Sequence, residues 1–308
     1  MSPRLLADLV YSRAGGADRL ADLWLPDGPG PHPLAIYLHG GGWRFGDRHL
    51  APDLSRHFAA SGLAMLSIDY RLSTEAIFPA AVIDTLTAVR WARHHAAACD
   101  LDPARIALWG SSAGGHLAAL AGLAGDGAFP SDEWPGVSAA VQAIAAGYPP
   151  TDFRQIDAQR DPTIRPSDDP ESAHLPAPRP ITDPQSLESL FLGARVGERP
   201  DLAARADPCR YARADAPPVL LLHGTADAAV PLGQSHLLYQ ALARAGATVA
   251  LAEVAGLGHG FLNRSDLDDR GPRSITLHRP GQAPETRQGG VFALTRAFLG
   301  QSLGRPAG

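Results

Sequence analysis

The stretch "RIALWGSSAGGHLAALAGL", residues 105–123, decides the fold expected for this chain. It joins a continuously apolar run, typical of a buried strand, to an alanine- and leucine-rich segment that is typical of a helix. Between them, Gly110 and Gly114 lie two residues before and two residues after Ser112, where a narrow turn has no room for side chains. Such an elbow would project the Ser112 hydroxyl above the sheet. The neighbouring Ser111 lacks this symmetric pair of glycines, and we expect its hydroxyl to point sideways.

Further apolar runs, bounded by turn residues, indicate a sheet. The first two runs alternate polar and apolar residues, as half-exposed antiparallel strands do, and the later runs are continuously apolar, as strands covered on both faces are. The runs span residues 5–13, 19–26, 32–40, 63–71, 105–112, 140–148, 218–227 and 248–256. The clearest helical stretches are 78–97, 234–246 and 289–303. We therefore predict a single α/β domain over residues 1–308, with an eight-stranded, mostly parallel sheet flanked by helices.

Two segments interrupt this alternation of strands and helices. Residues 149–216 are rich in proline and contain one helical patch, near "LESLFLGARV". A segment of this length without strands is either disordered or a lid over a site, and we predict a lid or cap insertion. Residues 262–289 are polar and arginine-rich. For these residues we predict a polar insertion that forms a solvated loop or a hairpin.

Composition and charge exclude several classes of protein. The chain has 308 residues, of which 45% are hydrophobic, and its formal net charge of −5 provides no basic surface for nucleic acid. No stretch approaches the roughly 20 apolar residues of a membrane span, and the N-terminal "MSPRLLADLVYSRAGG" lacks a signal-peptide core. Cys99 and Cys209 lie far apart without metal-ligand spacing, which favours free thiols in a reducing compartment. We therefore expect a cytoplasmic protein that binds neither membrane nor nucleic acid, with a homodimer left open.

Two later loops carry the residues that would activate Ser112. A serine hydroxyl is a weak nucleophile and needs a base that a carboxylate orients. The run "LLLHGTADAAVP" places Asp227 just beyond one strand, and "EVAGLGHGF" places His259 just beyond the next. The order Ser112, Asp227, His259 is that of α/β-hydrolases, so we predict these three residues as a catalytic triad. We expect His223 to be structural and His116 to pack near the site.

The glycine-rich stretch "HGGGWRFGD", residues 39–47, follows the apolar run 32–40. A tetrahedral intermediate needs hydrogen-bond donors for its oxyanion, and glycine lets backbone N–H groups approach a substrate closely. We predict an oxyanion hole formed by the N–H groups of Gly41, Gly42 and Ala113. His39 would anchor this loop by hydrogen bonding. Trp43 would wall the acyl pocket, with a role in the core as an equal alternative.

Taken together, these stretches resemble a known family. The chain is similar to α/β-hydrolase esterases of the bifunctional feruloyl/acetylxylan esterase type and to hormone-sensitive-lipase-like carboxylesterases. The similarity covers about residues 5–148 and 205–262, through "HGGGWRFGD", "DYRL", "FPAAVIDTLTAVRW", "DPARIALWGSSAGGHLA", "DPCRY", "HGTADAAVP" and "GLGHGF". It implies the α/β-hydrolase fold with a lid insertion, and it places Tyr148 and Phe261 beside the substrate together with Trp43. Arg71 and Asp84 would pair to tie the "DYRL" loop to the following helix.

The resemblance also implies a chemistry. We expect a serine carboxylesterase (a carboxylic ester hydrolase) that cleaves short-acyl or aryl esters of small molecules without a cofactor or a metal. An arylformamidase, or a deacetylase of sugars or xylo-oligosaccharides, is the alternative, because such enzymes share the same machinery. A non-catalytic binding protein on this scaffold is disfavoured, because all three triad positions are occupied.

Overall fold

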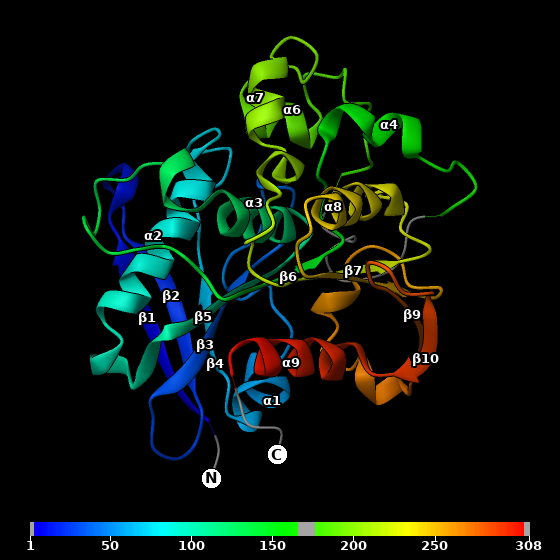
Figure 1. The fold of residues 1–308 in the computed structure, drawn as a ribbon. Coiled ribbons are helices and arrows are strands. Elements are labelled where there is room, and N and C mark those ends of the chain that lie inside the picture. Colours follow the sequence, from blue (N-terminus) through cyan, green and yellow to red (C-terminus); the bar gives the residue numbers. More distant parts are fainter. Residues whose placement is uncertain (1–2, 166–175, 305–308) are drawn as a thin grey trace.

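The computed structural model describes residues 3–165 and 176–304, and within them a single ten-stranded sheet forms the centre of the molecule. Its strands are β1 (Arg4–Ser12), β2 (Arg19–Leu25), β3 (His32–Leu38), β4 (Ala64–Ile68), β5 (Leu101–Ser111), β6 (Ala143–Gly147), β7 (Val219–Gly224), β8 (Val249–Val254), β9 (Arg273–His278) and β10 (Glu285–Gly289). They lie in the order β1-β2-β4-β3-β5-β6-β7-β8-β9-β10 (Figure 1). The strands from β4 to β8 in this order are parallel, and the pairs at both edges are antiparallel.

Helices cover both faces of the sheet. The longer helices are α2 (Ala80–His94), α3 (Ala113–Ala128), α8 (Leu232–Arg244) and α9 (Val291–Ser302), and the short ones are α1 (Leu54–His57), α4 (Ile156–Gln159), α6 (Leu187–Leu192) and α7 (Pro200–Arg205). Short 3-10 turns are η1 (Ala14–Gly16), η2 (Ala59–Ser61), η3 (Ala97–Cys99), η4 (Phe153–Gln155), η5 (Pro208–Tyr211), η6 (Phe261–Asn263) and η7 (Asp268–Arg270). Helices α2, α3 and α8 pack on one face, and α1 and α9 pack on the other (Figure 1).

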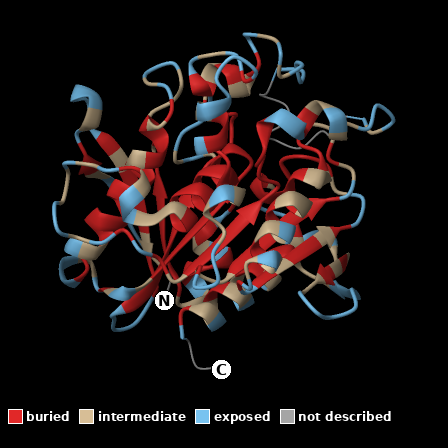
Figure 2. Ribbon diagram, turned by 45° about the horizontal axis from the view of Figure 1, so that its top comes forward, coloured by how far each residue is buried: buried red, intermediate tan, exposed pale blue. Residues whose placement is uncertain are grey.

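The central strand β3 shows why this sheet needs a layer of helices on each face. Leu34, Ile36 and Leu38 belong to the apolar cluster shared with α2, α3 and α8, whereas Ala35 and Tyr37 belong to the cluster shared with α1 and α9. Successive side chains of a strand point to opposite faces, so a continuously apolar strand is stable only between two layers. Figure 2 shows the resulting buried band through the middle of the molecule.

The predicted α/β class and the eight predicted strands are present, as β1 to β8, but the strand count was too low. The missing strands are β9 and β10, which form an antiparallel hairpin inside the segment 262–289. Strand β9 extends the sheet by pairing with β8, and it buries only Ile275 and Leu277. The outer strand β10 is almost entirely exposed. Because this hairpin buries so few apolar side chains, its composition is close to that of a solvated loop. The sequence of residues 262–289 therefore indicates a polar insertion and not a part of the sheet.

The segment 149–216 carries the short helices α4, α6 and α7, which stand outside α3 and α8 at the top of Figure 1. The helical patch expected near "LESLFLGARV" is α6, whose N-terminus is capped by the Ser186 hydroxyl and whose last residue, Leu192, is followed by the C-cap Gly193. Thr151 ties the start of the segment to α8, because its N–H donates to the side chain of Gln234 (2.7 Å). Residues 166–175 of the predicted lid lie outside the described residues.

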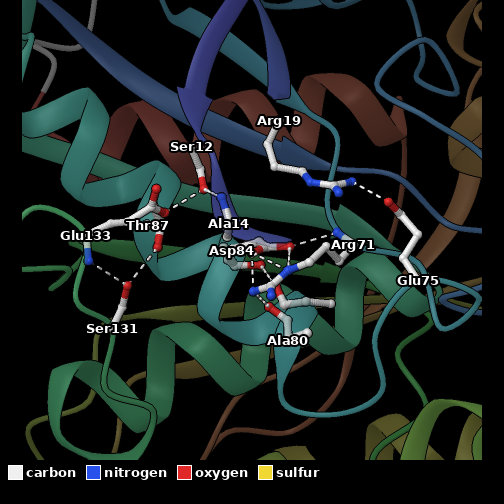
Figure 3. Close-up of polar contacts among 12 residues, drawn as sticks. Ser12, Ala14, Arg19, Arg71, Glu75, Ala80, Asp84, Thr87, Ser131 and Glu133 are labelled. Atoms are coloured by element: carbon white, nitrogen blue, oxygen red, sulfur yellow. Dashed lines mark hydrogen bonds and ion pairs between the residues drawn. The ribbon is translucent and has the colours of Figure 1, made fainter. Parts of the chain in front are cut away.

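The expected Arg71–Asp84 pair is confirmed and lies between the loop after β4 and helix α2 (Figure 3). The guanidinium donates from Nε and Nη2 to the carboxylate over 2.7–3.0 Å, and the Arg71 N–H donates to it as well (2.7 Å). The Asp84 side chain is 0% exposed, so these contacts replace the water that it lacks. Nearby, Arg19 pairs with Glu75 at 2.8 Å, so β2 is tied to the same loop.

Both cysteines, Cys99 and Cys209, are free thiols. None of the helices in the described part of the chain is long and apolar enough to cross a membrane. The cytoplasmic location and the homodimer stay predictions.

Candidate active site

Ser112 lies in the turn between β5 and α3 with φ 53° and ψ −120°, a backbone conformation that residues other than glycine rarely adopt. Its N–H donates to the carbonyl of Gly147 at the end of β6 (2.8 Å). The flanking glycines are required by close packing: a Cβ on Gly110 would lie 2.3 Å from the Gly114 carbonyl oxygen, and one on Gly114 would lie 2.0 Å from that of Leu38. The sequence therefore forms the expected elbow, and its geometry fixes the direction of the Ser112 side chain.

Ser112, His259 and Asp227 are brought together at the ends of β5, β8 and β7. The distance from Ser112 Oγ to His259 Nε2 is 2.8 Å, and that from His259 Nδ1 to Asp227 Oδ2 is also 2.8 Å. Because a carboxylate only accepts, the Nδ1–H donates to Asp227, which leaves Nε2 to accept the Ser112 hydroxyl proton. All three residues are 2–4% exposed. The arrangement can deprotonate a serine hydroxyl that is largely shielded from bulk water.

Asp227 is held as an anion by four neighbours. Its Oδ1 accepts the N–H groups of Ala229 and Val230, both at 2.9 Å. Its Oδ2 faces His259, with His223 Nε2 at 3.4 Å. Burial by itself raises the pKa of the Asp227 carboxyl, but the electrostatic attraction to His259 and the hydrogen bonds of both imidazoles outweigh it and hold that pKa well below its usual range.

The loop after β3 contains three successive residues with positive φ, namely Gly41 (105°), Gly42 (60°) and Trp43 (56°). A Cβ on Gly41 would lie 2.1 Å from the carbonyl oxygen of Phe45, so the tight turn needs glycine there. Of the predicted oxyanion donors, Gly42 and Ala113 line the cavity next to Ser112, whereas Gly41 does not.

His39 anchors this loop as expected. Its Nδ1–H donates to the carbonyl of Gly40 (2.6 Å), and its ring stacks on Tyr70 with the centroids 4.2 Å apart. Burial lowers the pKa of His39 to about 4, so the ring is neutral at physiological pH.

Trp43 is both a core residue and part of the cavity wall, and its role as a wall of the acyl pocket stays a prediction. It is 2% exposed, stacks on Phe191 of α6 (4.5 Å between centroids), and lines the cavity. Its Nε1–H donates to His116 Nδ1 (3.2 Å), and the opposite nitrogen of His116 donates to the carbonyl of Ala206 (2.7 Å). Burial lowers the pKa of His116 to about 4, which favours this neutral form. His116 thus joins the glycine loop, α3 and the segment 149–216.

A cavity of about 160 Å³ opens beside Ser112 and His259. The segment 149–216 supplies much of its wall, through Pro150, Arg160 and residues 176–179 and 185–188. Most of this wall is apolar, but Arg160, Arg179, Gln185 and Glu188 place polar side chains along it. Burial raises the pKa of Glu188. The sequence predicted a lid here but none of these individual residues, because the irregular backbone has no periodicity from which side-chain directions could be predicted.

Tyr148 and Phe261, predicted to bind substrate, do not line this cavity. Tyr148 packs edge-on against the His259 ring, with the centroids 4.7 Å apart, and against Phe261 at 4.9 Å. Its hydroxyl accepts the N–H of Leu262 (3.2 Å). Both side chains are 0% exposed. The prediction is corrected accordingly: these residues support the His259 loop from behind.

Ser111 is likewise directed away from the cavity. Its hydroxyl lies 3.1 Å from that of Tyr37, on the face of the sheet that α9 covers. The symmetric glycines correctly distinguish Ser112 from its neighbour.

The BD-FAE family model matches residues 21–242, which include Ser112 and Asp227. The chain belongs to the BD-FAE family. Esterase LipQ of Mycobacterium tuberculosis (strain ATCC 25618 / H37Rv) is 32% identical over 260 residues, which are 83% of this chain and 57% of LipQ. The chain therefore spans little more than half the length of this relative.

Solved structures similar to this BD-FAE member agree on the fold. A truncated carbohydrate esterase from gut microbiota superposes with a TM-score of 0.74 at 23% identity, over 98% of this chain and 97% of that one. The thermophilic esterase Est2 of Thermogutta terrifontis, with butyrate bound, gives 0.71 at 24% identity, over 99% and 96%. The fold is that of the α/β-hydrolases.

Proposed function

We propose that this chain is a serine carboxylesterase that hydrolyses short-acyl or aryl esters through an acyl-enzyme. The observation that carries the proposal is the unbroken series of hydrogen bonds from Ser112 through His259 to Asp227 at the wall of a cavity. A serine hydroxyl, an imidazole and a buried carboxylate in this geometry form the constellation that performs acyl transfer on unrelated folds.

Each residue then has a defined step. His259 Nε2 takes the hydroxyl proton as Ser112 Oγ attacks the ester carbonyl carbon, and the carbonyl electron pair moves onto its oxygen. Gly42 and Ala113 line the cavity, and their N–H groups would stabilise that oxyanion, while Gly41 shapes the tight turn before them. Collapse of the intermediate breaks the bond to the alkoxy oxygen, which leaves with the proton from His259. In the second half of the reaction, His259 takes a proton from a water molecule as the water oxygen attacks the acyl carbon. The bond to Ser112 Oγ then breaks, Ser112 regains its proton from His259, and the acid is released.

The neighbourhood of Ser112 supports a small acyl group. Trp43 closes one wall of the cavity and is itself fixed by Phe191 and His116, so that wall cannot recede for a long chain. The Est2 structure contains butyrate, and LipQ carries the name esterase. We assign residues 149–216 as the lid that selects the alcohol, because the described residues of this segment form much of the remaining wall.

The polar side chains of that wall favour one alternative. Arg160, Gln185 and Glu188 offer hydrogen bonds that an alkyl or aryl alcohol cannot use, which favours deacetylation of a hydroxylated alcohol such as a sugar. The catalytic steps are the same in either case.

Substitution of the reacting residues tests the proposal. Ser112→Ala and His259→Ala should each lower kcat for p-nitrophenyl acetate by roughly 10⁴–10⁶, and the double variant should be little worse than either, because both residues act in one proton transfer. Ser111→Ala is the matched control and should retain turnover. Wild-type turnover by folded Ser112→Ala protein would refute the assignment. A panel of p-nitrophenyl esters, acetylated sugars and N-formylkynurenine then distinguishes ester, sugar-ester and formamide substrates.

A further inference from the structure

Asp227 contacts a second histidine besides His259. His223 lies at the end of β7 and is 0% exposed. Its Nε2 is 3.4 Å from Asp227 Oδ2, the same oxygen that accepts from His259 Nδ1 at 2.8 Å. Two imidazoles therefore share one carboxylate oxygen, whereas the mechanism above uses only one of them.

The remaining contacts of His223 fix its protons. Nε2 is 3.0 Å from the carbonyl oxygen of Val230, which only accepts, so Nε2 carries a hydrogen. Nδ1 is 2.8 Å from the hydroxyl of Ser235 on α8, which can donate to it. The Nε2–H is thus directed between the Val230 carbonyl and Asp227, and the ring is held from behind by α8.

We propose that His223 is a positioning residue that sets how much of the negative charge of Asp227 is available to His259. The proposal rests on the triad proposed above. The Asp227 side chain is 0% exposed, so protein donors replace water around it. A donor on Oδ2 draws charge from the oxygen that stabilises protonated His259. His223 therefore lowers the proton affinity of His259 and keeps it an unprotonated base at a lower pH.

Other titratable groups surround this cluster, and a substitution of His223 leaves these residues themselves unchanged. Glu253 on β8 is the register neighbour of His223, and its Oε1 lies 2.9 Å from His236 Nε2 on α8 and 3.1 Å from His278 Nε2 on β9. The Tyr148 ring lies edge-on at 6.4 Å between centroids. The charged residues that share the cavity wall with His259 are Arg160, Arg179 and Glu188.

Three variants test the proposal through the pH dependence of kcat/KM for p-nitrophenyl acetate, whose acidic limb reports the protonation of the free enzyme's base. His223→Leu removes the donor and should move that limb to higher pH by roughly half a unit to one unit. His223→Gln keeps an N–H near the position of Nε2 and should return the limb close to that of the wild type. Ser235→Ala removes the contact behind the ring but leaves the donor, and its limb should stay in place.

The outcomes separate this proposal from that of the triad. A His223→Leu variant that is folded by circular dichroism and has the wild-type limb would overturn the proposal, as would a Gln variant that shifts as far as the Leu variant. A loss of thermal stability or of kcat without a shifted limb would show a merely structural role and would also overturn it. Failure of the triad itself would appear differently, as retained turnover by Ser112→Ala.

Discussion

Replacement of Asp227 by asparagine should disable the site in a way that follows from the four donors around it. Oδ1 accepts from the N–H groups of Ala229 and Val230, and Oδ2 faces the N–H groups of His259 and His223. An asparagine has one accepting oxygen and one donating NH₂. In either orientation the NH₂ faces two donors. If the asparagine oxygen accepts the N–H groups of Ala229 and Val230, its NH₂ group faces His259. The His259 ring must then accept at Nδ1 and carry its proton on Nε2.

That tautomer cannot take the proton of Ser112. The expected loss in kcat is about 10⁴, the magnitude known for the equivalent substitution in a serine protease, and the free energy of unfolding should fall by about 1–3 kcal/mol because buried donors lose their acceptor. Stopped assays with p-nitrophenyl acetate and urea unfolding measure the two effects. Asp207→Asn is the matched control, since Asp207 is 5% exposed and Asp227 is 4% exposed. The Asp207 carboxylate accepts the Cys209 N–H and does not line the cavity. A loss below tenfold in folded Asp227→Asn protein would refute this reasoning.

Three further outcomes follow. Burial lowers the pKa values of His39 and His116 from 6.5 to about 4, so below pH 6.5 the unfolded chain binds protons that the folded chain does not, and the free energy of unfolding should fall between pH 6.5 and 5 by about 1–2 kcal/mol per histidine. Urea unfolding of His116→Gln should show a shallower decline with pH. A decline as steep as that of the wild type would contradict the buried neutral form of His116. Asp84→Ala leaves the Arg71 guanidinium without its buried partner and should cost about 3–5 kcal/mol of stability, measured by the same method, with turnover per folded molecule retained. Among p-nitrophenyl esters, kcat/KM should peak between acetyl and butyryl, because Trp43 limits the cavity, and a peak at decanoyl or longer would show that the wall yields.

The sequence predicted the parts of the fold that depend on local rules. A strand covered on both faces must be apolar throughout, so β3 and β5 could be recognised as central strands, and the glycines around Ser112 could be recognised because the turn excludes side chains. For residues 262–289 the sequence left a solvated loop or a hairpin open, and it did not indicate that the hairpin extends the sheet, because β10 buries almost nothing. The alternation in "RSITLH", with Ile275 and Leu277 facing inward, was the available signal.

The site residues, too, could be predicted only in part. Ser112, Asp227 and His259 each follow a strand, and the ends of parallel strands meet at one edge of a sheet, so their proximity could be predicted from chain order. Tyr148 and Phe261 also follow strands, but chain order does not determine whether a side chain faces the cavity or the loop behind it. The wall from residues 149–216 depends on irregular backbone. The contact between His223 and Asp227 could not be predicted. It forms only because the loop after β7 returns toward the end of β7 and brings the Asp227 carboxylate close to the His223 ring.

The central claim is that Ser112 is the nucleophile, and covalent labelling tests it most directly. The protein is treated with a fluorophosphonate, digested, and sequenced by fragmentation that separates Ser111 from Ser112. The account predicts one adduct per chain, located on Ser112, with complete loss of esterase activity, no adduct in Ser112→Ala and normal labelling of Ser111→Ala. An adduct on Ser111 or on another hydroxyl, or full activity in the labelled protein, would contradict it.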